Sequence, residues 1–233
     1  MRETIVCGRF TLRSAPDLLA RHFDLEGVPE LAPRFNIAPT QAIATVCAPV
    51  AGGRRRLQLR RWGLIPRWAK DPSIGNRMIN ARAETVAEKP AFREAFRLRR
   101  CLVPADGFYE WAAGASPRQP YHIRLADGSP FAIAGLWEHW APTGGEAIES
   151  CTLITTRANA RLAAVHDRMP VILEPESYGP WLDSELREAD PLLPLLRPLS
   201  EQRIALGAVS RRVNNPRCDD ASCVEPLASG QLP

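Results

Sequence analysis

Prolines are the feature that most constrains how this chain can fold. The 233 residues include 22 prolines, spread along the whole sequence. Proline lacks a backbone N–H and interrupts both helix interiors and central strands. We therefore expect short elements joined by many turns, rather than a bundle of long helices. The chain is still long enough to bury a full core without disulfide bonds or structural metals.

Short apolar runs between turn signals predict many strands. A half-solvated strand is expected at 54–62, with Leu57 and Leu59 facing inward and the arginines facing outward. Gly52-Gly53 and Asp127-Gly128 are typical of hairpin turns. The remaining predicted strands are 42–50, 101–103, 107–111, 121–125, 131–136, 152–156, 171–173 and 204–210.

Helical patterns are fewer. Ser14-Ala15-Pro16-Asp17 resembles a capping box and predicts a helix to about Phe23. Apolar spacing, with Phe92 and Phe96 one turn apart, predicts a helix over 84–98. Shorter helices are predicted at 157–165, 175–186 and 191–196. Because strands outnumber helices, we expect an α+β fold: a single domain built on a curved, mainly antiparallel sheet or open β-barrel with flanking short helices.

The basic residues are almost all arginine. Lys70 and Lys89 are the only lysines among 30 basic residues, which leaves 28 arginines, and the formal net charge is +4. Arginine is suited to bidentate phosphate contacts. A surplus this small indicates nucleic-acid binding only weakly by itself.

The six cysteines favour free thiols in a reducing compartment. Cys47, Cys101 and Cys151 lie in apolar runs typical of a core, and no CxxC pair occurs. Cys218 and Cys223 lack a matching His/Cys pair, so no metal site is expected. Glycine-rich nucleotide-binding patterns are absent, and we expect no cofactor. The sequence has no signal-peptide or membrane-spanning run, which predicts a cytoplasmic protein.

Several segments carry more reactive, cationic and aromatic residues than a core requires. In chain order they are Cys7-Gly8-Arg9-Phe10, 34–41 (RFNIAPTQ), 62–68 (WGLIPRW), 80–85 (NARAET), 104–111 (PADGFYEW), 165–170 (VHDRMP) and 209–214 (VSRRVN). Taken together and in this order, they resemble the SOS response-associated peptidase family, also called the SRAP or abasic-site processing family. The resemblance runs from Cys7 to about Pro226, which predicts a SRAP domain over 7–226 and a tail over 227–233.

This resemblance implies a specific chemistry. Similar proteins use the free α-amine and the thiol of an N-terminal cysteine to form a thiazolidine with the aldehyde of an abasic site in single-stranded DNA. They also act as lyases, reverse the crosslink and process their own N-terminus, which is the origin of the peptidase label. We expect a monomer that associates with the nucleoid when it is bound to DNA.

Cys7 departs from the family pattern because six residues precede it. An amide nitrogen has no available lone pair and cannot condense with an aldehyde. We therefore interpret residues 1–6 as a non-native or removable extension. Translation from Val6, read from a GTG codon as methionine, would expose Cys7 once the methionine is removed, and proteolysis is the other route.

The resemblance also implies residue roles. Cys7 is the expected nucleophile, Glu110 a general acid with raised pKa, His166 a second proton carrier and Asn80 a neighbour of the reacting cysteine. The expected DNA-binding residues are Arg9, Asn36, Arg67, Trp68 and Arg82. Asn36 is also expected to shape the pocket floor. Trp62 fits either the core or base stacking, and the other histidines (His22, His122 and His139) are expected to be structural or exposed.

Two other functions fit parts of the sequence. A cysteine peptidase would use Cys7 as a thiolate with His166 as its base, and would need no free amine. A non-catalytic single-stranded-DNA-binding module would use the arginine and tryptophan side chains alone.

Overall fold

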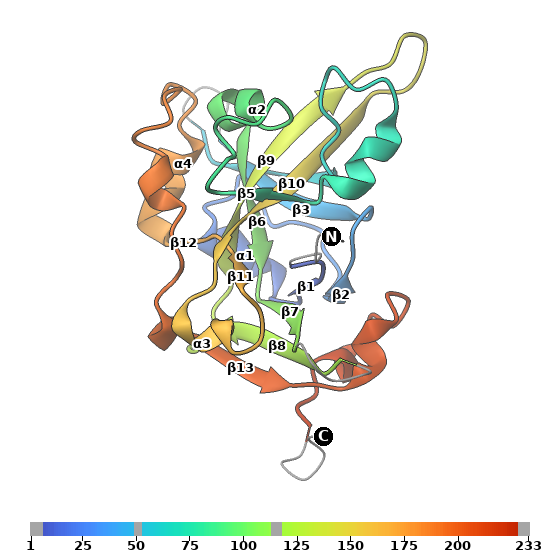
Figure 1. The fold of residues 1–233 in the computed structure, drawn as a ribbon, viewed down its shortest axis with the longest axis vertical. Helices are drawn as coiled ribbons and strands as arrows, with labels where there is room; N and C mark the ends of the chain where they lie inside the picture. The colour runs from blue at the N-terminus through green and yellow to red at the C-terminus, as the bar shows by residue number, and fades with distance from the viewer. Residues whose placement is uncertain (1–6, 49–52, 113–117, 228–233) are drawn as a thin grey trace.

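The computed structural model describes residues 7–48, 53–112 and 118–227. The predicted extension 1–6, Gly52 of the predicted Gly52-Gly53 hairpin and most of the predicted tail lie outside these described residues. Two β-sheets and several short helices form one body, with the first described residues beside β1 and β2 (Figure 1).

The larger sheet contains a closed barrel. Its barrel strands are connected in a ring, because β10 pairs with β9 as well as with β4. Pairing around the ring is antiparallel except between β10 and β4. The ring consists of β10 (Ile148–Arg157), β4 (Arg56–Trp62), β3 (Ala42–Cys47), β6 (Arg100–Ala105) and β9 (Phe131–Trp140).

Three short strands extend this barrel at its ends. β11 (Arg168–Pro170) pairs with β10, and β12 (Ile172–Leu173) pairs with β9. β5 (Asn80–Arg82) runs parallel to β10, with Asn80 opposite Leu153. The NAR and HDRMP segments therefore meet the same strand, β10, although 86 positions separate Asn80 from His166 (166 − 80).

The smaller sheet carries the N-terminal strand. Its order is β13 (Ile204–Ala208), β8 (Pro120–Leu125), β7 (Gly107–Trp111), β1 (Phe10–Leu12) and β2 (Arg34–Ile37), and every pairing is antiparallel. The predicted α+β class, with mainly antiparallel strands and short flanking helices, is confirmed. The barrel differs from the prediction in being closed rather than open.

The helices are shorter than the sequence predicts. The α-helices are α1 (Pro16–His22), α2 (Arg93–Leu98), α3 (Ala160–Ala163) and α4 (Tyr178–Leu182). The 3₁₀ helices are η1 (Pro72–Arg77), η2 (Pro175–Ser177), η3 (Leu193–Leu195), η4 (Glu201–Arg203), η5 (Arg211–Asn214) and η6 (Ala221–Cys223). The predicted helix over 84–98 is wrong in its first half, which forms turns as far as Phe92. Pro90 lies inside the predicted helix and lacks a backbone donor.

The predicted capping box is also wrong. Helix α1 has Ala15 as its N-cap and no side-chain capping bond. Ser14 instead donates hydrogen bonds from its backbone nitrogen and its hydroxyl to Oδ2 of Asp106, at 2.8 and 3.0 Å. A buried carboxylate from a distant loop thus replaces the local partner that the sequence motif indicates.

Strand β4 departs from its prediction at Leu59 and Arg60, whereas Leu57 is half-buried and packs against the core. Leu59 is 57% exposed, whereas Arg60 is only 2% exposed and shares a strand face with buried Trp62. The Arg60 guanidinium donates to Thr45 and stacks 4.3 Å from the ring centre of Trp137. These partners offset the cost of burying a charge. The indole of Trp62 is buried and donates to the backbone oxygen of Ile79, which assigns Trp62 to the core.

Asp127-Gly128 forms a turn but not a hairpin. The strands on either side belong to different sheets: β8 pairs with β7 and β13, whereas β9 pairs with β6, β10 and β12. Gly128 adopts φ +75°, which favours glycine. The turn therefore carries the chain from the smaller sheet into the barrel.

A buried polar network attaches β1 to β7. Oγ1 of Thr11 donates to Asp106 at 2.6 Å and lies 3.3 Å from Nε2 of His122. The backbone N–H of Arg13 also donates to Asp106, at 2.6 Å. Burial, reinforced by the charge of Arg13, lowers the pKa of His122 to about 4. The network holds Thr11 opposite Gly107 in the β1–β7 ladder.

Replacing Gly107 with alanine is expected to destabilise this junction. A Cβ atom at position 107 would lie 2.0 Å from Nε2 of His122, so the ring or the strand would have to move. We expect Gly107→Ala to lower the free energy of unfolding by about 1–3 kcal/mol, as overpacking does elsewhere. Thermal or denaturant unfolding measures the change. Gly207→Ala is the matched control, because nothing lies within 4 Å of a Cβ there, and equal losses in both variants would contradict the argument.

Candidate active site

Cys7 and Glu110 form the centre of the candidate site. The backbone nitrogen of Cys7 donates to Oε1 of Glu110 at 2.6 Å. Both residues are almost fully buried, at 0% and 2% exposure. Cys7 adopts φ +44°, a left-handed conformation that is uncommon for residues with a side chain and that costs on the order of 1 kcal/mol. The surrounding structure therefore holds the backbone nitrogen of Cys7 against the carboxyl group.

The ladder between β1 and β7 explains this meeting of distant residues. Phe10 lies opposite Phe108, and the backbone N–H of Tyr109 donates to the backbone oxygen of Arg9 at 3.0 Å. These pairings bring the residues before β1 alongside the end of β7. Glu110 lies two positions after Phe108, so its side chain leaves the strand on the same face as that buried ring.

Burial governs the protonation of both groups. It raises the pKa of Glu110 to about 8, although the hydrogen bond from Cys7 opposes this shift and the charge of Asp167 adds to it. Burial, followed by the nearby charge of Glu110, also raises the pKa of the Cys7 thiol well above its ordinary value. Near pH 7 the site therefore holds a protonated carboxyl group and a neutral thiol. The raised pKa predicted for Glu110 agrees with this environment.

Arg9 and Asn36 contact one another. Nη1 of Arg9 donates to Oδ1 of Asn36 at 3.0 Å and to the backbone oxygen of Val213 at 2.8 Å. The guanidinium also lies 6.0 Å from the ring centre of Trp111. Asn36 is fully buried, and its amide donates to the backbone oxygens of Val213 and Cys218, at 3.2 and 2.7 Å. The two side chains thus join the start of the chain to its C-terminal segment, and their DNA-binding roles stay predictions.

Asn80 and Arg82 lie on β5. Asn80 is half-buried, whereas Arg82 is exposed and pairs with Thr155 in β10. Strand alternation places both side chains on one face of β5. This arrangement is compatible with the predicted roles, which stay predictions: Asn80 beside the reacting cysteine and Arg82 on DNA phosphate.

His166 lies just before β11, and its ring is only 10% exposed. Nδ1 of His166 accepts a hydrogen bond from the backbone N–H of Arg168 at 3.1 Å and lies 3.1 Å from Oδ1 of Asp167. Nη1 and Nη2 of Arg168 donate to the two carboxylate oxygens of Glu84 at 2.6 and 3.0 Å. The HDRMP segment is therefore connected to the residues that follow β5.

Arg67 and Trp68 lie on the surface after β4. Trp68 is 60% exposed, and its indole N–H donates to the backbone oxygen of Pro90 at 3.4 Å. Arg67 lies 3.6 Å from Glu94, with both side chains more than half exposed. Within the described residues, the hydrogen bonds and ion pairs of these two side chains are made to the 90–94 segment rather than to Cys7 or Glu110.

Two functional candidates were missed in the sequence. Asp167 contacts His166, and its charge reaches Glu110. Asn214 accepts a hydrogen bond at 2.7 Å from the indole N–H of Trp111, the residue after Glu110. Both candidates lie inside motifs that the sequence showed, and only the fold reveals their neighbours.

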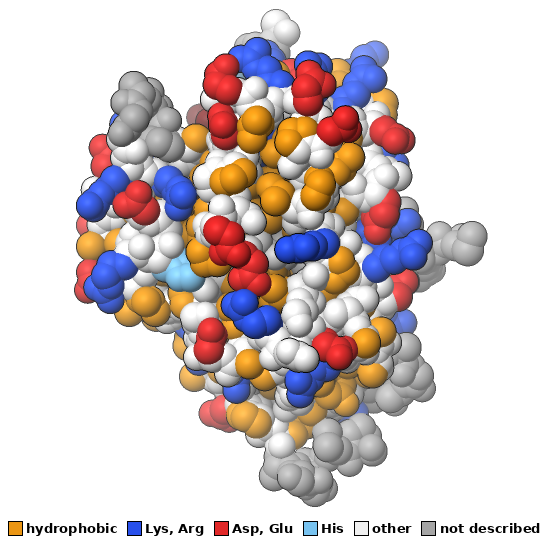
Figure 2. Space-filling view, turned by 90° about the vertical axis from the view of Figure 1, so that its left-hand side faces the viewer, with side chains coloured by type: hydrophobic (Ala, Val, Ile, Leu, Met, Phe, Trp, Pro, Cys, Tyr) orange, Lys and Arg blue, Asp and Glu red, His pale blue; other side chains and the backbone are white. Residues whose placement is uncertain are grey.

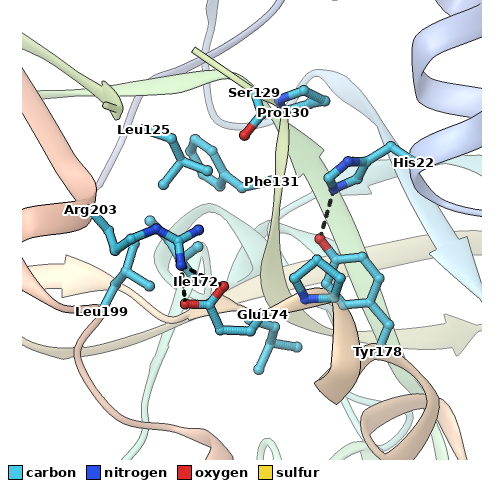
Figure 3. Close-up of a pocket in the computed structure, with 12 residues that line it drawn as sticks. His22, Leu125, Ser129, Pro130, Phe131, Ile172, Glu174, Tyr178, Leu199 and Arg203 are labelled. Carbon is cyan, nitrogen blue, oxygen red and sulfur yellow. Dashed lines mark hydrogen bonds and ion pairs between the residues drawn. The ribbon is translucent and has the colours of Figure 1, made fainter. Parts of the chain in front are cut away.

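A small pocket elsewhere does not belong to this site. It lies between His22, Tyr178, Glu174 and Arg203, with apolar walls (Figure 3). His22 is hydrogen-bonded to the Tyr178 hydroxyl at 3.1 Å, and Arg203 pairs with Glu174 at 3.0 Å. These internal contacts agree with the structural role expected for His22.

On the side of the molecule that carries α4, basic and acidic side chains are interspersed around apolar ones, without a large area of one charge (Figure 2).

The described residues contain no group of three or more His, Cys, Asp or Glu side chains placed to hold a metal ion. None of the described helices has the length and apolar character needed to cross a bilayer.

Comparison with known proteins identifies the family. The sequence profile of the SOS response associated peptidase (SRAP) family matches residues 6–216. The chain is 42% identical over 224 residues to the abasic site processing protein YoqW of Bacillus subtilis (strain 168), covering 94% of this chain and 99% of that protein. It is 35% identical over 196 residues to the abasic site processing protein HMCES of Xenopus tropicalis, covering 74% of this chain and 58% of that longer protein.

Solved structures share the same fold. A crystal structure of a protein from Bacteroides thetaiotaomicron superposes with a TM-score of 0.84 at 25% identity and covers 95% of this chain and 100% of its own. A protein from Bordetella bronchiseptica gives 0.75 at 27% identity and covers 88% and 100%. The chain belongs to the SRAP family, as its motifs predicted.

Proposed function

We propose that this protein processes abasic sites in single-stranded DNA by bonding covalently to them through Cys7. Its relatives YoqW and HMCES are named abasic site processing proteins. The observation that carries the proposal is the 2.6 Å contact between the backbone nitrogen of Cys7 and Glu110. That contact holds a titratable carboxyl group against the atom that must act as the nucleophile.

The proposed reaction has two bond-forming steps. The α-amine of Cys7 attacks C1′ of the ring-opened sugar, and loss of one water molecule gives an imine. The thiol then adds across the C=N bond, its proton moves to nitrogen, and a five-membered thiazolidine ring closes. Both nucleophiles belong to one residue, so the second step benefits from a high effective molarity. The reaction consumes no oxidant or reductant.

The contact between Cys7 and Glu110 supports a role for Glu110 in the proton transfers. Where the Cys7 nitrogen is an amide, burial raises the pKa of this carboxyl group to about 8. A free α-amine has an ordinary pKa of ~7.7–8.0, and its charged form beside the carboxyl group would lower the pKa of Glu110. The carboxyl group lies close enough to exchange a proton with the nitrogen, so it can accept a proton from the amine and return it to the departing oxygen.

The mechanism requires the active chain to begin at Cys7. An acylated nitrogen cannot form the imine. We therefore propose that residues 1–6 are absent from the active form, through initiation at Val6 followed by removal of methionine, or through proteolysis. Intact-mass measurement of the protein from its natural host tests this, and a crosslinking protein that retains Arg2 to Val6 would contradict it.

The roles that we propose for the remaining site residues follow from the family resemblance. Asn80 and His166 assist the reacting centre, while Arg9 and Arg82 bind phosphate and Asn36 shapes the pocket. Arg67 and Trp68 combine positive charge with an exposed indole, which suits contact with unpaired bases beside phosphate. Lyase activity, crosslink reversal and self-processing are further proposed activities of the same site, in a monomer that acts on DNA in the cytoplasm.

The raised pKa of the Cys7 thiol makes a cysteine peptidase the weaker alternative. A peptidase needs a thiolate, and burial of Cys7 disfavours that form. A simple DNA-binding module would need neither the left-handed Cys7 nor the buried Glu110.

Denaturing gel electrophoresis tests the proposal directly. The chain beginning at Cys7 is incubated with a single-stranded oligonucleotide that carries one abasic site, and with an intact oligonucleotide of the same sequence. A band that survives denaturation only with the abasic strand is expected. A complex that dissociates on denaturation and weakens with salt would instead indicate the binding module.

A further inference from the structure

Strand β2 contains a β-bulge at Phe35 and Asn36. In the β1–β2 ladder, the paired positions are two residues apart on β1 (10 and 12) but three residues apart on β2 (34 and 37). Phe35 and Asn36 therefore share a single opposite residue on β1, which is Thr11. A bulge of this kind bends its strand and redirects a side chain, and bulges are common beside active sites.

One carboxylate, that of Asp219, holds the bulge. Its Oδ1 accepts hydrogen bonds from the backbone N–H groups of Phe35 and Asn36, at 2.5 and 2.8 Å, and its Oδ2 accepts from the guanidinium of Arg34. Strand β2 is the last strand of the smaller sheet on this side within the described residues. Asp219 follows Asn36 by 183 positions, so a side chain from the C-terminal segment supplies the acceptor that a neighbouring strand would otherwise provide.

The bulge gives the side chain of Asn36 one orientation. Its Nδ2 donates to the backbone oxygens of Val213, Asn215 and Cys218, at 3.2, 3.1 and 2.7 Å. Carbonyl oxygens can only accept hydrogen bonds, so the amide cannot turn over without losing all three. Its oxygen Oδ1 is therefore fixed as the acceptor for Nη1 of Arg9, at 3.0 Å.

The guanidinium of Arg9 keeps donors for a ligand. Within the described part of the chain, its hydrogen bonds are made through Nη1, to Asn36 and to the backbone oxygen of Val213. Its Nε and Nη2 therefore remain for a substrate, and a guanidinium is suited to the oxygens of a phosphate. Arg9 is half-buried and follows Cys7 by two residues, so a phosphate bound there would lie close to the reacting cysteine.

We propose that Asp219 is a positioning residue for DNA binding: it holds the bulge of β2, and the bulge orients Asn36 so that Arg9 is fixed for a phosphate of the single strand. This inference rests on the proposed function, because Arg9 contacts phosphate only in a protein that binds DNA. Asp219 acts through Arg9 and not on the DNA, since both of its oxygens are occupied by β2.

Hydrogen exchange tests the first link without DNA. We expect the amides of Phe35 and Asn36 to exchange about tenfold faster or more in Asp219→Ala, because their acceptor is lost. Asp219→Asn keeps one oxygen for both N–H groups and should show a smaller acceleration. Asp220→Ala is the control, because it removes a neighbouring carboxylate that is bonded to Ser222 instead, and both amides should keep their native rates. Native rates in Asp219→Ala overturn the proposal.

Binding of an intact single-stranded oligonucleotide tests the second link, with chains that begin at Cys7. Asp219→Ala should weaken binding on the order of tenfold, and Arg9→Ala by at least as much. Loss of one phosphate contact should also reduce the slope of log K against log salt by about 0.7. Asp220→Ala should retain the native slope.

Combining the two substitutions separates positioning from a general structural effect. If Asp219 acts through Arg9, the double variant should bind no more weakly than Arg9→Ala alone. Losses that add in the double variant overturn the proposal, as does faster amide exchange with a native affinity and slope. Should Asp219→Ala fail to fold, Asp219→Asn replaces it in the same comparison.

Crosslinking distinguishes this proposal from the proposed function. If the native chain binds the intact strand but forms no crosslink with an abasic strand, the proposed chemistry fails. The coupling between Asp219 and Arg9 then still decides the positioning role, because it is measured on a strand without a lesion. A native chain that does not bind single-stranded DNA overturns both.

Discussion

A chain that begins at Cys7 is expected to crosslink abasic DNA at least about a hundredfold faster than a chain that retains residues 1–6. The difference follows from the nitrogen, which is an amine in the first chain and an amide in the second. Loss of this nucleophile removes the covalent step as a whole, and only a side reaction at another residue would remain. Time courses on denaturing gels measure the two rates.

Two controls make the result interpretable. Cys7→Ser in the shortened chain keeps the amine but lacks the thiol, so it should form an imine that is trapped by borohydride and is lost without it. Thermal unfolding of both chain lengths should show that each is folded. Efficient crosslinking by the extended chain, with mass spectrometry locating the DNA on another residue, would contradict the proposed mechanism.

Replacing Glu110 with glutamine is expected to slow crosslinking by about 10²–10⁴-fold, the usual contribution of a general acid or base. Glutamine can still accept the hydrogen bond from Cys7 but cannot exchange a proton. In the native chain beginning at Cys7, the rate should fall as the pH drops below the amine pKa of ~7.7–8.0 and the amine becomes protonated, and it should also fall at high pH as Glu110 ionises. The fall at high pH should be absent from the residual rate of Glu110→Gln. A native rate in this variant would exclude Glu110 from the reaction.

The same carboxyl group should make stability depend on pH. Its folded-state pKa of about 8 lies above the unfolded value of ~4.3, so the folded chain binds more protons between these pH values. The contribution of Glu110 to the free energy of unfolding is therefore fully present below about pH 4.3. It is lost as the pH rises to 8, by at most about 1.4 kcal/mol per pH unit for one group. Denaturant unfolding of the extended chain, in which Cys7 carries an amide, should show this slope. Glu110→Gln should reduce it, whereas the exposed control Glu185→Gln should not.

The family, the fold class and the main strands could be predicted because they depend on local patterns and on motif order. The orientation of β4 could not be predicted, because the alternation of side chains along a strand does not show which of its two faces is buried. Leu59 is exposed and Arg60 is buried because Thr45, Glu149 and Trp137 surround the guanidinium, and all three come from other strands.

The sequence predicts which residues belong to the candidate site better than it predicts the contacts between them. Cys7 and Glu110 were both selected from the sequence, but their contact depends on the β1–β7 ladder and joins residues 103 positions apart. Asp167 was passed over because an acidic residue beside a histidine has no distinctive local pattern. Its importance emerges only when β11 and β10 bring the HDRMP segment close enough for its charge to reach Glu110.

The contacts of Arg9 and Asn36 have a consequence for protein synthesis. Both side chains bind backbone oxygens of the C-terminal segment, at Val213 and Cys218. During translation that segment is still inside the ribosome when strands β1 to β12 have already emerged. A nascent chain therefore cannot complete the contacts of Arg9 and Asn36 with this segment until synthesis is nearly finished. Strands β1 and β2, although translated early, complete their contacts last.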